Sequence, residues 1–345
     1  MKIALVMPTH FDIGSVMAGG ERYAFELSRA LSRHVPTSLI TFRREPMVVQ
    51  TDALTIHYCR SWFSAGGGIN PVSLAHLRLL ADCDVIHCLQ PRTIVTDTAL
   101  LFGRWRGIPT FLTDLSGGAP ITPSRLIPMR NMMTGFLPIS EFNRRQNPGI
   151  TRPTTIIFGG VDANQFTPDP AVTRERDLFV YVGRIFPGKG LHVLLEALPP
   201  AARLIVIGSK ASDEYRRTVT ALAAGKQVEF LGARPDAEVV AAYRRALAVV
   251  LPSLVDTGFT SSMEAMACGA PVIGTSLGSL PEVVRNGVTG TLVPPDDPAA
   301  LSACLTDALT DPDRYHRMAP ACRSDVVKRF TWDRVAERCL AAYRA

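Results

Sequence analysis

The sequence lacks the features that mark several special classes of protein. Aromatic residues make up only 7% of its 345 residues, and no apolar run reaches the roughly 18–20 residues of a membrane-spanning helix. Neither a repeat nor a low-complexity tract is present, which argues against fibrous and disordered proteins. The seven cysteines are an odd number without a CxxC pair, so we expect free thiols and no structural metal site.

The excess of positive over negative charge is also small. The formal net charge is +6, from 37 basic and 31 acidic residues that are spread over both halves. Nucleic-acid-binding proteins concentrate basic residues in a stripe with interleaved aromatics, so we expect no nucleic-acid partner. Residues 1–8 are typical of a first strand rather than of a signal peptide, so a cytoplasmic location is expected.

What is present is an alternation of short Val/Ile/Leu runs with helical patterns, which is typical of βα units and parallel sheets. The predicted strands are residues 3–8, 38–42, 85–89, 110–113, 155–158, 178–182, 202–207, 228–231, 248–251, 272–274 and 290–293. We therefore expect an α/β fold with two doubly wound, Rossmann-like domains that face a cleft. The first domain is predicted at residues 1–166 and the second at 167–330, followed by a C-terminal helix at 331–345 that packs back on the first domain.

Two glycine-containing loops are candidate phosphate sites. Gly19 and Gly20 stand between the first strand and a helix, where free N–H groups and the helix dipole favour an anion. An ordinary tight turn would have the same glycines. The second loop, GRIFPGKG at 183–190, resembles a nucleotide-binding P-loop but has glycine instead of the Mg²⁺-binding hydroxyl at its end. Its two cations, Arg184 and Lys189, suit a diphosphate.

A third segment combines two acids with a short helix. Asp256 lies on the loop after the strand at 248–251, and Glu264 is predicted in the first turn of the helix that follows. A carboxylate there is stabilised by the helix dipole. Such a pair suits a polyhydroxylated anion, with the helix amides on phosphate and the carboxylates on hydroxyl pairs. Glu264 alone could equally be an ordinary acid at a helix start.

Together these segments resemble the retaining GT-B glycosyltransferases of family 4, the glycosyl transferases group 1. The resemblance rests on the ordered set of GG before a helix, GRxxxxKG, and two acids eight residues apart followed by AMACGAPV. It extends to PISEF, FGGVDANQF, SLPEVVRNGVTGTLVPPDD and the closing TWDRVAERCLAAY, at residues 138–142, 158–166, 279–297 and 331–343. The similarity thus covers most of the chain.

The resemblance implies a retaining, metal-independent hexosyltransferase that needs no cofactor. Its donor would be a nucleoside-diphosphate sugar, with UDP or GDP favoured, and its acceptor a hydroxyl on a glycan, a lipid-linked sugar or a small glycoside. The implied catalytic residues are Asp114, Arg184, Lys189 and Asp256. The implied donor-binding residues are Gly19, Gly20, Arg184, Lys189, Arg234, Gly258, Phe259, Thr260 and Glu264. In this set Glu264 would bind the ribose hydroxyls and Arg234 would lie near the base.

The chain departs from the family pattern at several positions. Asp256 stands where the family usually has Glu. Thr260 begins a polar stretch at a place where the family usually has apolar residues. Many members have a His near the end of the strand at 110–113, where this chain has Asp114, which we expect to take that role or to be a plain turn acid. These departures leave two alternatives, a catalytically degenerate nucleotide-sugar-binding protein and a GT-B-fold sugar epimerase.

Contact with a membrane is a further expectation. Residues 102–106 and 125–133 mix apolar and basic side chains, which suits peripheral attachment to the inner face of a membrane or, equally, a plain surface helix. The acceptor-side loops, at 65–71 and 116–130, match no pattern that identifies the acceptor. The sequence also contains no signal for an oligomeric state.

Overall fold

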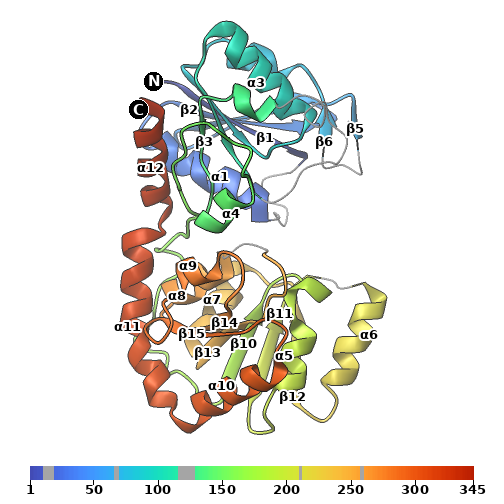
Figure 1. Ribbon diagram of the computed structural model, residues 1–345, viewed down its shortest axis with the longest axis vertical. Helices are drawn as coiled ribbons and strands as arrows, with labels where there is room; N and C mark the ends of the chain where they lie inside the picture. Colours follow the sequence, from blue (N-terminus) through green and yellow to red (C-terminus); the bar gives the residue numbers. More distant parts are fainter. Residues whose placement is uncertain (11–18, 66–69, 116–128, 210–211, 257–259) are drawn as a thin grey trace. The chain divides into compact units, whose positions relative to one another are not determined.

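The chain forms two compact units, each with its own sheet (Figure 1). The first unit consists of Met1–Gly160 and Trp332–Ala345, and the second of Val161–Thr331. The computed structural model describes residues 1–10, 19–65, 70–115, 129–209, 212–256 and 260–345.

The boundary predicted after residue 166 is wrong, because residues 161–166 belong to the second unit. The N–H of Val161 donates to the carbonyl of Phe330 at 2.8 Å, and the ring of Phe166 packs against that of Tyr243. These contacts hold residues 161–166 in the second unit. The prediction placed the boundary later because residues 167–176 have the polar composition of a linker. The last helix, at Trp332–Arg344, lies in the first unit.

The first unit is built on a seven-stranded sheet in the order β3-β4-β2-β1-β7-β8-β9, parallel except for the antiparallel pair β3–β4. The predicted strands at 3–8, 38–42, 85–89 and 110–113 are confirmed. The strand predicted at 155–158 is wrong: its neighbour β9 has only two residues, too few to support a ladder. The strands are β1 (Ile3–His10), β2 (Thr37–Arg43), β3 (Met47–Thr51), β4 (Leu54–Arg60), β7 (Val85–Leu89), β8 (Thr110–Thr113) and β9 (Gly135–Phe136), beside a hairpin of β5 (Phe63–Ala65) and β6 (Asn70–Val72).

The second unit has a six-stranded parallel sheet in the order β12-β11-β10-β13-β14-β15, and all six predicted strands are confirmed. The chain moves outward from β10 to β12 and then returns to β13 on the other side of β10. In open α/β sheets, ligands bind at the carboxyl ends of the strands where the order reverses in this way. The strands are β10 (Leu178–Val182), β11 (Arg203–Ile207), β12 (Gln227–Gly232), β13 (Ala248–Leu251), β14 (Val272–Thr275) and β15 (Gly290–Val293).

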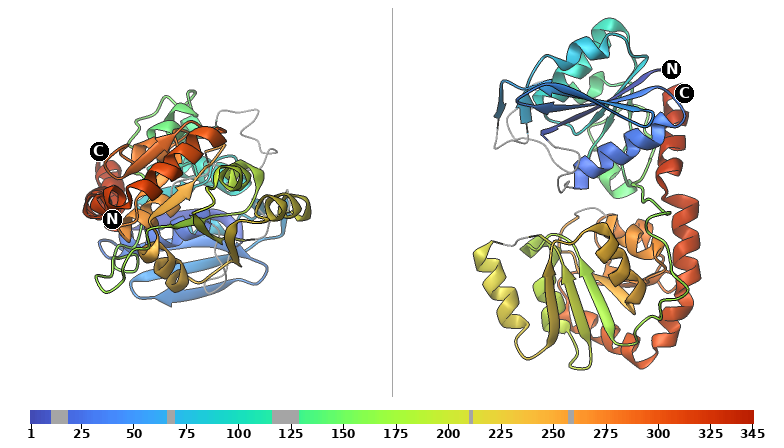
Figure 2. Two further views of the ribbon diagram at one scale, coloured as in Figure 1. Left: turned by 90° about the horizontal axis from the view of Figure 1, so that it is seen from below. Right: turned by 180° about the vertical axis from the view of Figure 1, so that it is seen from behind.

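Helices pack against these sheets (Figures 1 and 2). In the first unit they are α1 (Gly19–Ser32), α2 (His76–Leu80), α3 (Ile94–Arg106), α4 (Glu141–Arg145) and α12 (Trp332–Arg344). In the second they are α5 (Leu191–Ala197), α6 (Asp213–Leu222), α7 (Asp236–Arg245), α8 (Thr260–Ala267), α9 (Leu280–Val283), α10 (Pro298–Thr310) and α11 (Pro312–Arg329). Helix α5 packs against α6 and α10, and α8 packs against α7 and α11.

The two faces of the first sheet bury separate hydrophobic cores. Alternate residues of a strand point to opposite faces, so Leu5 of β1 lies in one core and Val6 in the other. The core with Leu5 also contains apolar residues of α1 and α12, which lie side by side (Figure 2). The core with Val6 contains residues of α3. The strand is therefore apolar along its whole buried length.

A buried chain of hydrogen bonds ties α12 to this sheet. Thr113 donates its hydroxyl to the carbonyl of Leu137 at 2.8 Å, so it accepts from Nε2 of His87 at 2.8 Å. The Nδ1 atom of His87 then accepts from the hydroxyl of Tyr343 on α12 at 2.7 Å. This requires a neutral imidazole, and burial lowers the pKa of His87 to about 3.

We predict that this histidine makes the protein less stable in acid. An unfolded histidine gains a proton below its ordinary pKa of about 6.5, whereas folded His87 stays neutral down to about 3. Its contribution to the free energy of unfolding is therefore complete above pH 6.5 and decreases as the pH falls from 6.5 toward 3. Replacement His87→Phe should lower the free energy of unfolding at pH 7.5 by about 2–4 kcal/mol, because two polar partners lose a bond.

Urea unfolding between pH 5 and 8 measures both effects. His87→Phe should also reduce the acid slope, to which one such group contributes at most about 1.4 kcal/mol per pH unit. Tyr343→Phe is the matched control, since it removes one hydrogen bond and keeps the imidazole. An acid slope that is the same in His87→Phe and the wild type would show that other groups set the acid stability.

Candidate functional site

The loops after β10 and β13, which leave the second sheet where its order reverses, are in close contact. The N–H of Leu254 donates to the carbonyl of Gly188 at 2.9 Å. Gly190 has a φ of +67°, and a Cβ there would lie 1.9 Å from the carbonyl oxygen of Pro252. Only glycine fits this backbone conformation and this approach. The two candidate loops of the second unit are therefore parts of one site.

Two cations lie close together on the β10 loop. The guanidinium of Arg184 is exposed and lies over the ring of Phe186, with Cζ 5.0 Å from the ring centre. Lys189 is partly buried, and this burial lowers the pKa of its ammonium to about 8. The positive charge of Arg184 lowers it further, whereas the carboxylate of Asp256 opposes the shift. A multiply charged anion at this loop would stabilise both cations.

Asp256 has a contact that the sequence did not predict. Its Oδ1 atom accepts hydrogen bonds from the hydroxyl and the N–H of Ser279, at 2.7 and 3.1 Å. Gly278, with a φ of +64°, makes room for the carboxylate, because a Cβ there would lie 2.4 Å from Oδ1. Asp256 thus joins the β13 loop to the segment before α9. The predicted role of this carboxylate toward a sugar stays a prediction.

Glu264 is buried on α8 near a tyrosine of α7. The hydroxyl of Tyr243 donates to Oε2 of Glu264 at 3.4 Å. Burial and the negative charge of Glu264 hold the pKa of Tyr243 well above its usual range, so the hydroxyl keeps its proton. The prediction that Glu264 lies in the first turn is wrong: α8 begins at Thr260, which places Glu264 one turn further along.

Tyr243 is the residue that reasoning from the sequence missed. It belongs to no motif, and its place in a helical pattern predicts only a core residue. The remaining predicted residues of the second unit lie apart or outside the described ranges. Thr260 is the exposed first residue of α8, while Gly258 and Phe259 fall in a segment that the structure does not describe. Arg234 follows the edge strand β12 and pairs with Glu238 at 3.5 Å.

The other predicted residues lie in the first unit. Gly19 and Gly20 begin α1, and a Cβ added to Gly20 would lie 3.3 Å from Cε of Met7 and 3.8 Å from Cδ1 of Leu115. The neighbour of Leu115, Asp114, is buried at the carboxyl end of β8, where its Oδ2 accepts from Nδ2 of Asn147 at 3.2 Å. These residues therefore share the carboxyl edge of the first sheet.

Within residues 1–10, 19–65, 70–115, 129–209, 212–256 and 260–345, no three His, Cys, Asp or Glu side chains lie close enough together to hold a metal ion. None of the helices in the described part of the chain combines the length and the apolar character needed to cross a membrane.

Comparison with known proteins finds relatives of this chain. The sequence model of the glycosyl transferases group 1 matches residues 164–325, which include both loops and α8. Over 378 aligned residues the chain is 27% identical to the phosphatidyl-myo-inositol mannosyltransferase of Mycobacterium tuberculosis, covering 99% of this chain and 96% of that protein.

Solved structures show the same fold. Sucrose-phosphate synthase from Thermosynechococcus elongatus superposes with a TM-score of 0.79 at 22% identity, covering 99% of this chain and 98% of that one. HepE from Anabaena, solved in complex with UDP-glucose, superposes with a TM-score of 0.75 at 18% identity over 100% of this chain and 99% of that one. The predicted fold of two Rossmann-like domains is thus confirmed as the GT-B fold, and residues 164–325 match the glycosyl transferases group 1.

Proposed function

We propose that this protein is a retaining hexosyltransferase of family 4 that moves a sugar from a nucleoside diphosphate to a hydroxyl without a metal ion or cofactor. The observation that carries the proposal is the pair of cations, Arg184 and Lys189, on the β10 loop. This loop is hydrogen-bonded to the β13 loop at the carboxyl ends of the strands where the strand order reverses. In such a transfer the departing group is a diphosphate, on which negative charge develops as the bond to the sugar breaks. Cations already in place there stabilise that charge, as a metal ion does in other transferases.

The rest of the donor would lie along α8 and the β13 loop. Glu264 would accept hydrogen bonds from the ribose hydroxyls, with its carboxylate oriented by Tyr243. Asp256 and residues 258–260 would face the sugar, and Arg234 would lie near the base. In the first unit, Gly19 and Gly20 would approach the phosphates, and Asp114 would contact a hydroxyl of the donor or acceptor. The departing phosphate oxygen would accept the proton of the attacking acceptor hydroxyl, on the same face of the sugar.

The relatives support the class of donor and acceptor. One is named a mannosyltransferase that acts on phosphatidyl-myo-inositol, another a D-inositol 3-phosphate glycosyltransferase, and HepE was solved with UDP and UDP-glucose. We therefore favour a hexose on UDP or GDP as donor and a polyhydroxylated acceptor. A lipid-linked acceptor would place the protein at a membrane surface.

The surface of α3 suits such a contact. The side chains of Trp105 and Leu101 are 76% and 43% exposed, and the guanidinium of Arg106 lies 5.8 Å from the Trp105 ring. An amphipathic patch with aromatic and basic residues is typical of peripheral contact with anionic membranes. We include peripheral attachment through α3, in a cytoplasmic protein, in the proposed function.

Thermal unfolding with UDP, GDP, ADP and CDP tests the proposed donor site. One nucleoside diphosphate should raise the melting temperature, and the rise should be the same with and without EDTA. A ligand that binds only the native state stabilises that state by about 2.7 kcal/mol when the ligand concentration is a hundred times its Kd. Lys189→Ala should abolish this shift, and transfer should fall about a hundredfold. Binding should also weaken as the pH rises through about 8, where unliganded Lys189 loses its charge.

Arg216→Ala is the control for these measurements, since it removes an exposed cation of α6 that is paired with Asp213. No shift with any nucleotide would favour a degenerate protein or an epimerase with other ligands. A shift that EDTA abolishes would contradict metal independence, and a normal shift in Lys189→Ala would contradict the assigned diphosphate site.

Tyr243→Phe tests how the ribose is recognised. We expect wild-type protein to bind the nucleoside diphosphate about tenfold more tightly than its 2′,3′-dideoxy form, because Glu264 would lose the hydrogen bonds from the two ribose hydroxyls. The variant should lose most of this preference while its affinity for the dideoxy form stays the same. Tyr315→Phe, a second buried tyrosine of this unit that is bonded to Thr291, is the control. If the preference persists in Tyr243→Phe, the tyrosine does not position Glu264.

Sedimentation with vesicles tests the contact of α3 with a membrane. Vesicles with 30% phosphatidylglycerol, about the content that gives a markedly negative surface, should bind the protein, and pure phosphatidylcholine should not. Trp105→Ala should weaken binding, because the variant lacks the indole ring that would insert into the membrane interface. Trp62→Ala, at a tryptophan that is 64% exposed and lies outside α3, should have no effect. Equal binding by Trp105→Ala and the wild type would overturn this part of the proposal.

A further inference from the structure

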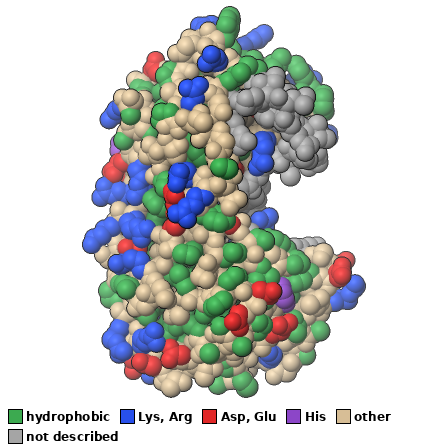
Figure 3. All heavy atoms as spheres, viewed as in Figure 1, with side chains coloured by type: hydrophobic (Ala, Val, Ile, Leu, Met, Phe, Trp, Pro, Cys, Tyr) green, Lys and Arg blue, Asp and Glu red, His purple; other side chains and the backbone are tan. Residues whose placement is uncertain are grey.

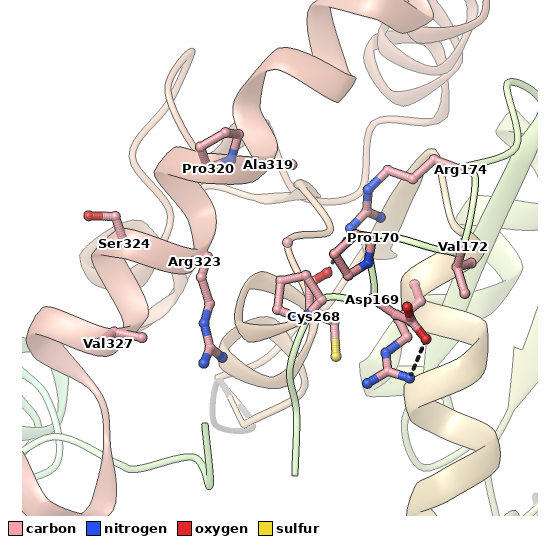
Figure 4. Close-up of a pocket in the computed structure, with 13 residues that line it drawn as sticks. Asp169, Pro170, Val172, Arg174, Cys268, Ala319, Pro320, Arg323, Ser324 and Val327 are labelled. Carbon is pink, nitrogen blue, oxygen red and sulfur yellow. Dashed lines mark hydrogen bonds and ion pairs between the residues drawn. The ribbon is translucent and has the colours of Figure 1, made fainter. Parts of the chain in front are cut away.

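The second unit contains a pocket that the proposed function does not use. Its volume is about 590 Å³, which is within the range of sites for small organic molecules. None of its lining residues comes from the loops after β10 and β13. Three arginines, Arg174, Arg244 and Arg323, surround it, and we call it the arginine pocket (Figure 4).

The walls of the arginine pocket come from segments far apart in the sequence. Residues 168–174, which lead into β10, form one wall with two prolines and Val172. Helix α11 forms the opposite wall, with Ala319, Pro320 and Val327 (Figure 4). Cys268 and Gly269, directly after α8, also line it. Apart from the arginines, most of this lining is apolar.

The charges around the pocket do not balance. Asp169 is the one acid among its lining residues, and it lies 3.5 Å from the guanidinium of Arg244. Neither Arg174 nor Arg323 has a carboxylate within 4.0 Å in the described part of the chain. Three guanidinium groups thus face one carboxylate, which leaves an excess of two positive charges beside an apolar cavity.

Main-chain carbonyls hold the two arginines that lack a carboxylate partner. Arg174 donates to the carbonyl of Cys268 at 2.7 Å, and Arg323 donates to those of Ala267 and Ala163 at 3.0 and 2.8 Å. Carbonyl groups satisfy N–H donors but carry no net charge, so the cost of partly burying two cations is only partly offset. Burial correspondingly lowers the pKa of both guanidinium groups. An anion in the pocket would supply the missing negative charge.

Basic side chains outnumber acidic ones on the helix that forms one wall of the pocket. Helix α11, which forms one of its walls, has five basic and two acidic residues. Lys and Arg side chains gather along the α11 side of the second unit (Figure 3).

We propose that the arginine pocket binds a small organic anion, whose carboxylate, sulfonate or phosphate group lies toward the arginines and whose carbon skeleton contacts the prolines and Val327. Each half of the proposal rests on a different observation. The unbalanced guanidinium groups select the charge, and the apolar walls select a ligand larger than an inorganic ion. The site is separate from the proposed donor site, because the two share no residue.

Titration calorimetry with two probes of matched shape tests this proposal. Naphthalene-2-sulfonate should bind the full-length protein, and the uncharged naphthalene-2-sulfonamide should bind at least about tenfold more weakly. Val327→Trp should fill the mouth of the pocket and abolish binding. Val288→Trp, at a valine of similar exposure on the turn before β15, is the matched control. Arg244→Gln, at the arginine that has a carboxylate partner, should weaken the sulfonate and leave the sulfonamide unchanged.

Several outcomes would overturn the proposal. Equal affinity for the sulfonate and the sulfonamide would show that charge does not select the ligand. Unchanged binding by Val327→Trp, with the same melting temperature as Val288→Trp, would place the probe elsewhere. Competition by the nucleoside diphosphate, or loss of binding in Lys189→Ala, would assign the probe to the donor site. Absence of binding to the wild type would also refute the proposal.

Discussion

The contact between the loops after β10 and β13 is the constraint on which the candidate site of the second unit depends. Parallel strands bring their carboxyl ends to one edge, but they do not by themselves bring two loops into contact. Here Gly190 allows the β10 loop to reach the carbonyl of Pro252, where a Cβ would overlap with the oxygen. Because Lys189 precedes this glycine and Asp256 follows Pro252 by four residues, the approach of two backbones places a cation near an acid.

Helix α8 is held by contacts with side chains of other segments. Its Glu264 contacts Tyr243 of α7, while the carbonyls at its end accept from Arg174 and Arg323. Positive side chains at the carboxyl end of a helix complement its dipole as well as its free carbonyls. The same arginines surround the arginine pocket, so residues that support the helix also create an uncompensated positive charge behind it.

Much of the fold could be predicted from the sequence, because fully buried parallel strands require continuous apolar runs. Strands β10, β11, β13 and β14 of the second sheet follow that pattern, as does β1, whose residues enter the cores on both faces. Strand β3 could not be predicted, since it is a largely exposed edge strand with no such run. Residues 155–158 have an apolar pattern but lack a neighbouring strand long enough to form a ladder, which is a property of the sheet and not of the segment.

The sequence alone determined the two Rossmann-like domains, the resemblance to the glycosyl transferases group 1 and the types of residue at the candidate site, because periodicity and motif spacing are local properties. Only the tertiary structure decided which groups meet. Tyr243 lies against Glu264, Ser279 binds Asp256, and a buried chain from Thr113 through His87 joins Tyr343 to the first sheet. Such contacts join residues that are 21 to 256 positions apart, and they depend on strand order and helix packing, which no local pattern contains.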